Sequence, residues 1–277
     1  VAAVVVSRLP EGWTLPAIIV PDTLVALGRI AHAWRAQFQI PVIGVTGSNG
    51  KTTVKEMIAA ILAAAVGEDA RLATQGNLNN EIGVPLTLFR LDASHRAAVV
   101  ELGMNHPGEI GRLSAIATPT VGLVNNAQRE HQEFMHTVEA VARENGSVLQ
   151  ALSADGVAVF PGDDTYTALW RELATCKVIT FGLSDACDVR ATYTSNGFGS
   201  TLQVTAPGTR FELALAAAGE HNVRNALAAI ACALGAGIEQ GAIVRGLEAF
   251  APVGGRLQSK RDRKSTRLNS SHVAISY

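Results

Sequence analysis

Gly47-Ser48-Asn49-Gly50-Lys51-Thr52-Thr53 is a glycine-containing loop that lies between a strand pattern and a helix pattern. The apolar run Val42–Val45 precedes the loop, and apolar residues recur after it at helical spacing from Val54 to Ala65. Strand, glycine loop and helix in this order are typical of a phosphate-binding loop in an α/β sheet. The N–H groups would face the phosphates, Lys51 would reach the β and γ oxygens, and the Thr52 hydroxyl would bind Mg²⁺. The sequence therefore predicts an ATP site.

Composition and charge set the broad class of the protein. The chain has 277 residues, of which 48% are hydrophobic, and this suits the packed core of one large α/β domain or two ordinary ones. Its net charge is −1 and no basic stripe is interleaved with aromatic residues, which argues against a nucleic-acid partner. The positive charge that attracts phosphate must then lie at the predicted loop itself. We expect a monomer that binds small molecules.

Cysteine usage and the apolar runs bear on the compartment. Cys176, Cys187 and Cys232 are odd in number and have no CxxC spacing, as expected for free thiols in a reducing cytosol. No apolar stretch approaches the ~18 residues of a membrane span, and Val1–Val6 lacks the features of a signal peptide. We therefore expect a cytoplasmic protein without a membrane partner. Because no initiator Met is present, we also expect the chain to begin inside a longer protein.

The order of the patterns predicts the fold class. A helix from about Asp22 to Ala36 follows a strand-like Ala3–Val6 and a Pro-rich connection through Pro10, Pro16 and Pro21. Strands then alternate with helices, which indicates a doubly wound, mostly parallel sheet. The expected strands are 42–46, 97–102, 120–125, 157–160 and 178–181. Three runs with alternating polarity, joined by Asn196-Gly197 and Pro207-Gly208, predict added antiparallel hairpins at 189–194, 200–206 and 210–216. Helices are expected at about 222–235 and 239–250.

Polar residues cluster after several of the expected strands, where ligands bind in doubly wound sheets. Glu101 ends an apolar run beside the loop strand, at the place expected for a Mg²⁺-holding acid. The segment from Gly76 to Pro85 carries Asn77, Asn79 and Asn80 in a turn, which is also explained by Asx-turn chemistry. His131 follows another strand, but one histidine among seven indicates little by itself.

Six motifs occur in the order seen in the Mur ligases, and the chain resembles this family from about Leu15 to Arg256. They are T-G-S-N-G-K-T-T, G-N-L-N-N-E-I-G-V-P-L-T-L, E-L-G-M-N-H-P-G-E-I, N-x-x-x-x-H, G-E-H-N-V-R-N-A-L-A-A-I-A and P-V-G-G-R. The first is a variant loop, with Val45 where the common phosphate-loop pattern has glycine. The second and third resemble those of the members that join D-alanyl-D-alanine to UDP-N-acetylmuramoyl-tripeptide. The resemblance thus implies these two substrates, ATP and Mg²⁺, and an ADP-forming ligation through an acyl phosphate in peptidoglycan precursor synthesis.

The resemblance also assigns roles to residues. It places Lys51, Glu101 and His131 in catalysis, and Thr52, Glu101 and His131 on Mg²⁺, with His131 on a second ion near the acyl acceptor. The nucleotide would contact Gly47, Ser48, Asn49, Gly50, Lys51, Thr52, Thr53, Asn222, Asn225 and Arg256. Asn222 and Asn225 match adenine contacts, and Arg256 matches a residue at the interdomain hinge. Asn77, Asn79 and Asn80 match a loop that approaches the carboxylate end of the tripeptide.

By the same resemblance the chain divides into four parts. Residues 1–38 would be a remnant of the N-terminal UDP-substrate domain and its linker, 39–250 the central ATP-binding domain, and 251–258 the hinge to a C-terminal domain. Residues 259–277 depart from the family, and K-S-T-R-L-N-S-S-H resembles translated sequencing-adapter sequence, so we expect a non-native disordered tail. The chain would then be truncated at both ends, binding ATP but inactive alone.

Asn145 is a departure from the family pattern. Many members carry at this position a lysine that is carbamylated to bind the second metal, and asparagine cannot form a carbamate. The stripe of Val138, Val141 and Leu152 predicts that Asn145 faces inward. Either its amide oxygen serves directly or through water, or Glu144 compensates.

Two other functions compete with the cell-wall ligase. The nearest alternative is another Mur-type ligase or a folylpolyglutamate synthase, because the folylpolyglutamate synthases share T-G-x-N-G-K-T-T. The second and third motifs favour the cell-wall ligase over both. The other is a nucleotide-binding module without catalysis, for which Glu101 or His131 would point away from Lys51. The sequence leaves open whether the third residue of the tripeptide is diaminopimelate or lysine.

Overall fold

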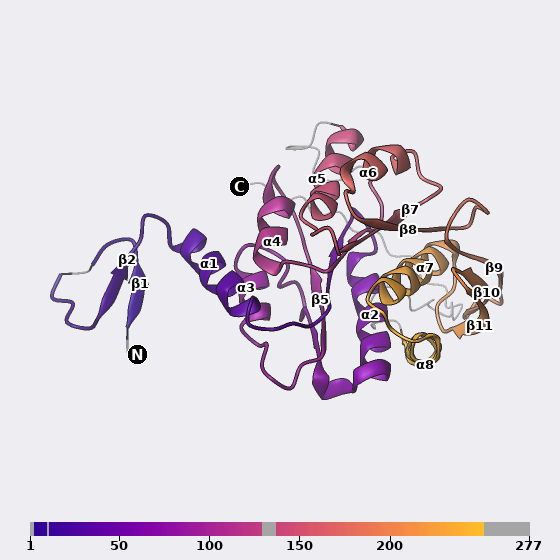
Figure 1. Ribbon diagram of the computed structural model, residues 1–277, viewed down its shortest axis with the longest axis horizontal. Coiled ribbons are helices and arrows are strands. Elements are labelled where there is room, and N and C mark those ends of the chain that lie inside the picture. The colour runs from indigo at the N-terminus through magenta and orange to yellow at the C-terminus, as the bar shows by residue number, and fades with distance from the viewer. Residues whose placement is uncertain (1–2, 10, 129–136, 252–277) are drawn as a thin grey trace, which may run out of the picture.

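A mixed sheet forms the centre of the computed structural model, which describes residues 3–9, 11–128 and 137–251. In these ranges the sheet has nine strands in the order β11-β10-β9-β8-β7-β6-β3-β5-β4 (Figure 1). Their bounds are β3 Val42–Thr46, β4 Arg71–Ala73, β5 Ala97–Glu101, β6 Val121–Val124, β7 Val157–Pro161, β8 Lys177–Gly182, β9 Val189–Ser195, β10 Ser200–Ala206 and β11 Thr209–Leu215.

Strand direction reverses at two neighbouring pairs of the sheet, so that β10 alone runs against the other eight strands. The strands from β4 to β9 pair in parallel, whereas β9, β10 and β11 form an antiparallel meander. At the β9–β10 turn, the Asn196 side chain accepts hydrogen bonds from the N–H groups of Phe198 and Gly199. The predicted fold class, a doubly wound parallel sheet with added hairpins, is confirmed.

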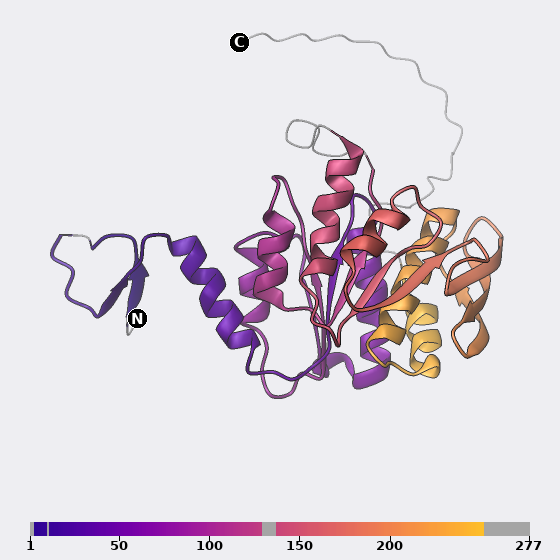
Figure 2. The ribbon, with the colours of Figure 1, turned by 45° about the horizontal axis from the view of Figure 1, so that its top comes forward.

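Helices cover both faces of the sheet, and Figure 2 shows the two helical layers (Figure 2). One layer contains α2 (Lys51–Val66), α7 (Glu220–Gly235) and α8 (Gln240–Ala249), and the other contains α3 (Gly83–Leu88), α4 (Glu109–Ala117), α5 (Val138–Gln150) and α6 (Thr167–Leu173). The short η1 (Glu68–Ala70) follows α2. Each layer encloses its own apolar cluster against the sheet, which is why strands such as β3 are buried along their whole length. No helix in the described ranges has the length and apolar character needed to cross a membrane.

The N-terminal segment differs in part from the expectation. Helix α1 (Thr23–Arg35) begins after Asp22, whose side chain accepts from the N–H groups of Leu24 and Val25, so the predicted N-cap is confirmed. The stretch after Pro16 is not only a connection, because Ala17–Ile19 forms β2 and pairs in parallel with β1 (Val4–Val6). A strand of three residues is too short to show a strand period, so this pairing was missed. The predicted domain boundary after residue 38 stays a prediction.

Arg35 ties α1 to the end of α4. Its side chain is buried, and Nε donates to the Ala117 carbonyl at 3.2 Å while Nη2 donates to the Thr118 carbonyl at 3.3 Å. Nη1 and Nη2 also donate to the carbonyls of Phe38 and Ile40. Burial lowers the pKa of Arg35, yet a guanidinium stays protonated in proteins. The cation thus satisfies carbonyls that the helix ends leave without partners.

We expect Arg35→Met to lower the free energy of unfolding by about 2–4 kcal/mol, because it keeps the aliphatic stem but leaves buried carbonyls without donors. Urea denaturation followed by circular dichroism measures the loss. Arg29→Met, on an exposed part of the same helix, is the control and should change stability by less than about 0.5 kcal/mol. Equal effects of the two substitutions would contradict this role for Arg35.

Candidate nucleotide-binding and ligation site

Two glycines shape the loop between β3 and α2. Gly47 has a φ of 135° and Gly50 a φ of 77°, both in the region that side chains disfavour. A Cβ atom on Gly50 would also lie 2.7 Å from Asn225 Oδ1 and 2.9 Å from Asn125 Nδ2. Position 50 therefore requires glycine for its backbone angle and for its packing against this amide pair.

The N-terminus of α2 leaves several donors for an anion. In the described part of the chain, the N–H groups of Gly50, Lys51, Thr52 and Thr53 have no acceptor, and the helical bonds start with Val54, which donates to the Gly50 carbonyl at 2.9 Å. Such a helix end attracts phosphate through its free donors and its dipole. Lys51 lies there too, with Nζ donating to the carbonyls of Gly47 and Ser48. The predicted loop has the geometry of an anion site.

Glu101 faces the loop from the neighbouring strand. Because β5 pairs with β3, the carboxylate at the end of β5 lies beside α2, and Thr52 Oγ1 is 3.4 Å from Glu101 Oε1. Glu101 is only 2% exposed. Asn79 Nδ2 donates to Oε1 at 2.9 Å, while Oε2 is buried and has no partner among the described residues. Burying a carboxylate oxygen without a hydrogen-bond partner costs folding free energy, unless a bound ligand supplies the missing contact.

These groups fit a Mg²⁺ ion. In the described ranges, no cluster of three or more His, Cys, Asp or Glu side chains could hold a metal by itself. Mg²⁺ commonly takes one or two protein oxygens and completes its shell with water and substrate phosphates. The Thr52 hydroxyl and the unpartnered Glu101 oxygen supply such a pair beside the free N–H groups of α2. Glu101 thus points toward the loop and not away from it, and its role in catalysis stays a prediction.

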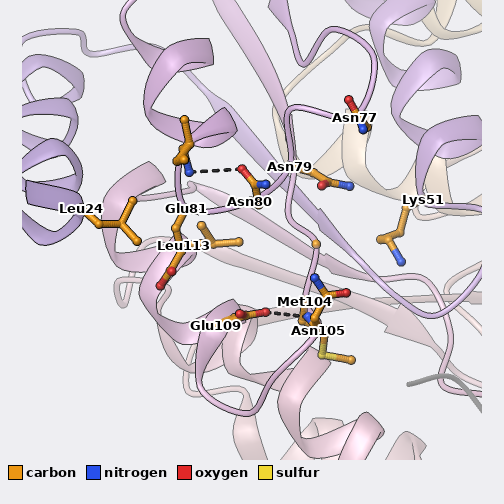
Figure 3. A pocket seen from close by; sticks show the side chains of 12 residues that line it. Leu24, Lys51, Asn77, Asn79, Asn80, Glu81, Met104, Asn105, Glu109 and Leu113 are labelled. Carbon is orange, nitrogen blue, oxygen red and sulfur yellow. Dashed lines mark hydrogen bonds between the residues drawn. The ribbon is translucent and has the colours of Figure 1, made fainter. Parts of the chain in front are cut away.

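A cavity of about 520 Å³ opens from Lys51 toward α4. Figure 3 shows Lys51 and Asn77 on one side of it and Leu24 and Glu81 on the other (Figure 3). Asn79 and Asn80 also line it, so the structure brings the three predicted asparagines to the same cavity as Lys51. Two of these asparagines, Asn79 and Asn80, also make hydrogen bonds within the protein. Asn79 holds Glu101, and the Asn80 side chain accepts from the N–H groups of Ile82 and Gly83 at the start of α3.

A second cavity of about 470 Å³ lies on the other side of the loop, between β7, β8 and α7. Asn49, Gly50 and Asn225 line it, which suits a nucleoside whose phosphates lie at α2. Asn222 does not line it. This side chain is buried and its Nδ2 donates to the Ala218 carbonyl at 2.8 Å, so its contact with adenine stays a prediction.

Sequence reasoning missed an ion pair at this cavity. Arg224 donates to Asp163 at 2.8 Å, and Asp163 also accepts from the Leu183 N–H. Burial alone raises the pKa of Asp163, but the Arg224 hydrogen bond and the backbone donors outweigh it and lower the pKa. A charged pair thus joins the end of β7 to α7. Its residues are 61 positions apart, and no local pattern reveals such a contact.

Side chains of the segment that follows β6 form hydrogen bonds to the phosphate loop, and sequence reasoning also missed these contacts. The side chains of Asn125, Asn126 and Gln128 all bond to Asn49 of the loop. The N–H of Gln128 also donates to Ser48 Oγ at 2.9 Å. The paired asparagines after an apolar strand were the available signal, since polar residues at strand ends gather where ligands bind.

Asn145 faces inward, as predicted, and is 1% exposed. Its Oδ1 accepts from the Gly47 N–H at 3.1 Å, while its Nδ2 is buried without a partner in the described structure. Glu144 serves elsewhere, because its carboxylate accepts from the N–H groups of Gly108 and Ile110 at the start of α4. Asn145 therefore contacts the phosphate loop, and Glu144 caps a neighbouring helix.

Two predicted residues, His131 and Arg256, lie outside the described residues. Their roles at a second metal and at the hinge stay predictions. The structure does bring Lys51, Thr52, Glu101 and Asn79 together at one sheet edge.

Comparison with known proteins agrees with this geometry. The model of the Mur ligase middle domain matches residues 45–233. The UDP-N-acetylmuramoyl-tripeptide--D-alanyl-D-alanine ligases of Haemophilus influenzae and Escherichia coli are 38% and 40% identical, over 257 and 260 residues, to this chain. Each alignment covers 92% of the chain and 56% of the relative. The chain thus spans about half the length of the curated relatives it matches.

A solved structure shows the same fold. The crystal structure I of MurF from Acinetobacter baumannii superposes with a TM-score of 0.86 at 38% identity, covering 92% of this chain and 55% of that one. Together with the family match over most of the sheet and its helices, this shows that the chain belongs to the Mur ligase family and contains its middle domain.

Proposed function

We propose that this chain is the ATP-binding part of an ADP-forming ligase that joins D-alanyl-D-alanine to UDP-N-acetylmuramoyl-tripeptide. The observation that carries the proposal is that Lys51 lines the same cavity as Asn77, Asn79 and Asn80, while the adjacent Thr52 hydroxyl contacts Glu101. The names of the similar ligases favour this substrate pair over folate and glutamate. Such a ligase would supply peptidoglycan precursors in the cytoplasm, where ATP is available.

The chemistry asks this site to bring two anions together, a carboxylate and the γ-phosphoryl group of ATP. Positive charge and fixed donors therefore matter more than a strong base. The free N–H groups of Gly50–Thr53 would bind the β-phosphate region, and Lys51 would leave its carbonyl partners to contact the transferring phosphoryl group. Mg²⁺, held by Thr52 and Glu101, would screen the phosphate charge. The asparagine side of the cavity would then receive the carboxylate of the tripeptide.

The deciding experiment has two parts. Calorimetry with Mg²⁺-ADP tests whether this chain binds nucleotide, and the proposal fails if no binding is detected. Product analysis of a full-length enzyme with this sequence then compares ATP, the UDP-tripeptide and D-Ala-D-Ala with ATP, folate and glutamate. Product in the second mixture alone would assign the chain to the folate-type ligases instead.

We expect Glu101→Gln to weaken the Mg²⁺ dependence of ADP binding, because the amide keeps the shape of the side chain but removes the anionic oxygen offered to the metal. In the wild type, Mg²⁺ should tighten ADP binding, and in the variant this gain should fall about tenfold. Calorimetric titrations with ADP in Mg²⁺ and in excess chelator measure both. A variant whose Mg²⁺ response overlays the wild type would leave Glu101 with a structural role.

A further inference from the structure

The phosphate loop does not offer all its N–H groups to a ligand. Gly47 donates to Asn145 Oδ1 at 3.1 Å, Ser48 to the Asn126 carbonyl at 3.2 Å, and Asn49 to Asn126 Oδ1 at 2.9 Å. These successive donors are used by protein acceptors, whereas the next ones, from Gly50 onward, have none in the described chain. The loop is thus divided into a held first half and an open second half.

Asn126 fixes the middle of the loop at two points. Its Oδ1 accepts from the Asn49 N–H, and its Nδ2 donates to the Asn49 carbonyl at 2.9 Å. One side-chain amide therefore sets the orientation of the peptide groups on both sides of Asn49. Exchanging the oxygen and nitrogen of this amide would place donor against donor and acceptor against acceptor, so the hydrogen bonds also fix its orientation.

The neighbouring amide of Asn125 positions Gly50, the residue that follows Asn49 in the loop. Asn125 Nδ2 donates both to the Asn49 carbonyl at 2.8 Å and to Asn225 Oδ1 at 3.1 Å, and Gly50 packs against this amide pair. With the Asn49 peptides fixed, the Gly50 turn that starts α2 is fixed too. Donors held in place before the ligand arrives bind an anion more strongly than donors that must first be ordered.

We propose that Asn126 is a positioning residue for the nucleotide phosphates. It acts through the Asn49 backbone, holding the first half of the loop so that the open N–H groups of the second half converge on phosphate. This proposal rests on the proposed function, because it requires that the loop binds a nucleotide. It assigns to the chain segment after β6 a part in phosphate affinity.

The test separates phosphate affinity from nucleoside affinity. Calorimetry of the whole chain with Mg²⁺-ADP, Mg²⁺-pyrophosphate and adenosine is done for the wild type and Asn126→Ala. Because Asn126 also lines the nucleoside cavity, we expect the variant to lose about tenfold or more in affinity for ADP and pyrophosphate and a clearly smaller factor for adenosine. An equal loss for all three, or no loss for pyrophosphate, would overturn the proposal.

Two further variants guard the interpretation. Asn196→Ala is the control, because it removes an amide that accepts two backbone N–H bonds in the distant β9–β10 turn. Like Asn126→Ala it loses two hydrogen bonds to the backbone, but it leaves the phosphate loop unchanged. It should leave all three affinities unchanged even where its Tm falls. If Asn126→Ala does not fold, Asn126→Ser serves instead, because it keeps a polar group but removes the amide that spans the N–H and the carbonyl of Asn49, and it should give a smaller loss of the same kind. Wild-type protein that binds no Mg²⁺-ADP would refute the proposed function, whereas normal ADP binding by both Asn126 variants would refute only this inference.

Discussion

Replacing Lys51 by alanine in a full-length enzyme with this sequence is expected to lower kcat about a hundredfold or more, with the fold intact. The ammonium group would stabilise charge on the transferring phosphoryl group, and the loss of one such preorganised donor costs about 3 kcal/mol. Folding should be unaffected, because Nζ bonds only to carbonyls of its own loop among the described residues. Phosphate release with the proposed substrates measures kcat, and circular dichroism checks the fold.

Lys177→Ala is the matched control, since this lysine is exposed at the start of β8, away from the loop. It should keep wild-type kcat. Lys51→Arg keeps the positive charge but changes its shape and reach, and should recover only part of the activity. If Lys51→Ala retained a kcat within a few-fold of wild type, the assignment of this loop to the transferred phosphoryl group would be wrong.

A bulky side chain at Gly246, in the helix that packs against α2, is expected to lower stability strongly. A Cβ atom at this position would lie 2.4 Å from Ile61 Cα and 2.7 Å from Ile61 N, so α8 approaches the backbone of α2 directly. We expect Gly246→Ala to lower the free energy of unfolding by about 2 kcal/mol and Gly246→Leu by more than about 3 kcal/mol, because the helices must separate. Denaturant titrations measure both.

A glycine in the same helix provides a control with the opposite sign. At Gly241 the added Cβ would meet only the flexible end of Arg245, at 3.2 Å. Gly241→Ala should therefore stabilise the protein by up to about 1 kcal/mol, the ordinary gain of alanine over glycine in a helix. A stabilising Gly246→Ala would show that α8 shifts at little cost.

The features that local patterns carry were predictable from the sequence. Strand β3, the loop and α2 follow from one motif and two periodicities, and the pairing of β3 with β5 places Glu101 where the sequence placed it. The hairpins of β9, β10 and β11 follow from alternation and turn residues. Each of these signals lies within a short window of the chain.

The features that were missed depend on contacts between distant segments. The hydrogen bonds of Asn126 to the loop join residues 77 positions apart, and those of Arg35 to the end of α4 join residues 82 and 83 positions apart. A single sequence gives no register for such contacts. Glu144 illustrates the same limit, because the sequence left open whether it compensates for Asn145, while in the structure its side chain caps α4.

The position of β3 inside the sheet bears on when the phosphate loop can fold during synthesis of the chain. This strand lies between β5 and β6, and both of its neighbours leave the ribosome after it. A nascent chain that stops before β6 would carry the whole glycine motif but none of the amides that hold the loop, since Asn125, Asn126, Asn145 and Asn225 are still to come. Domains generally fold as units during synthesis. The loop can therefore gain all of these partners only after the chain through α7 has emerged, although its motif is synthesised long before them.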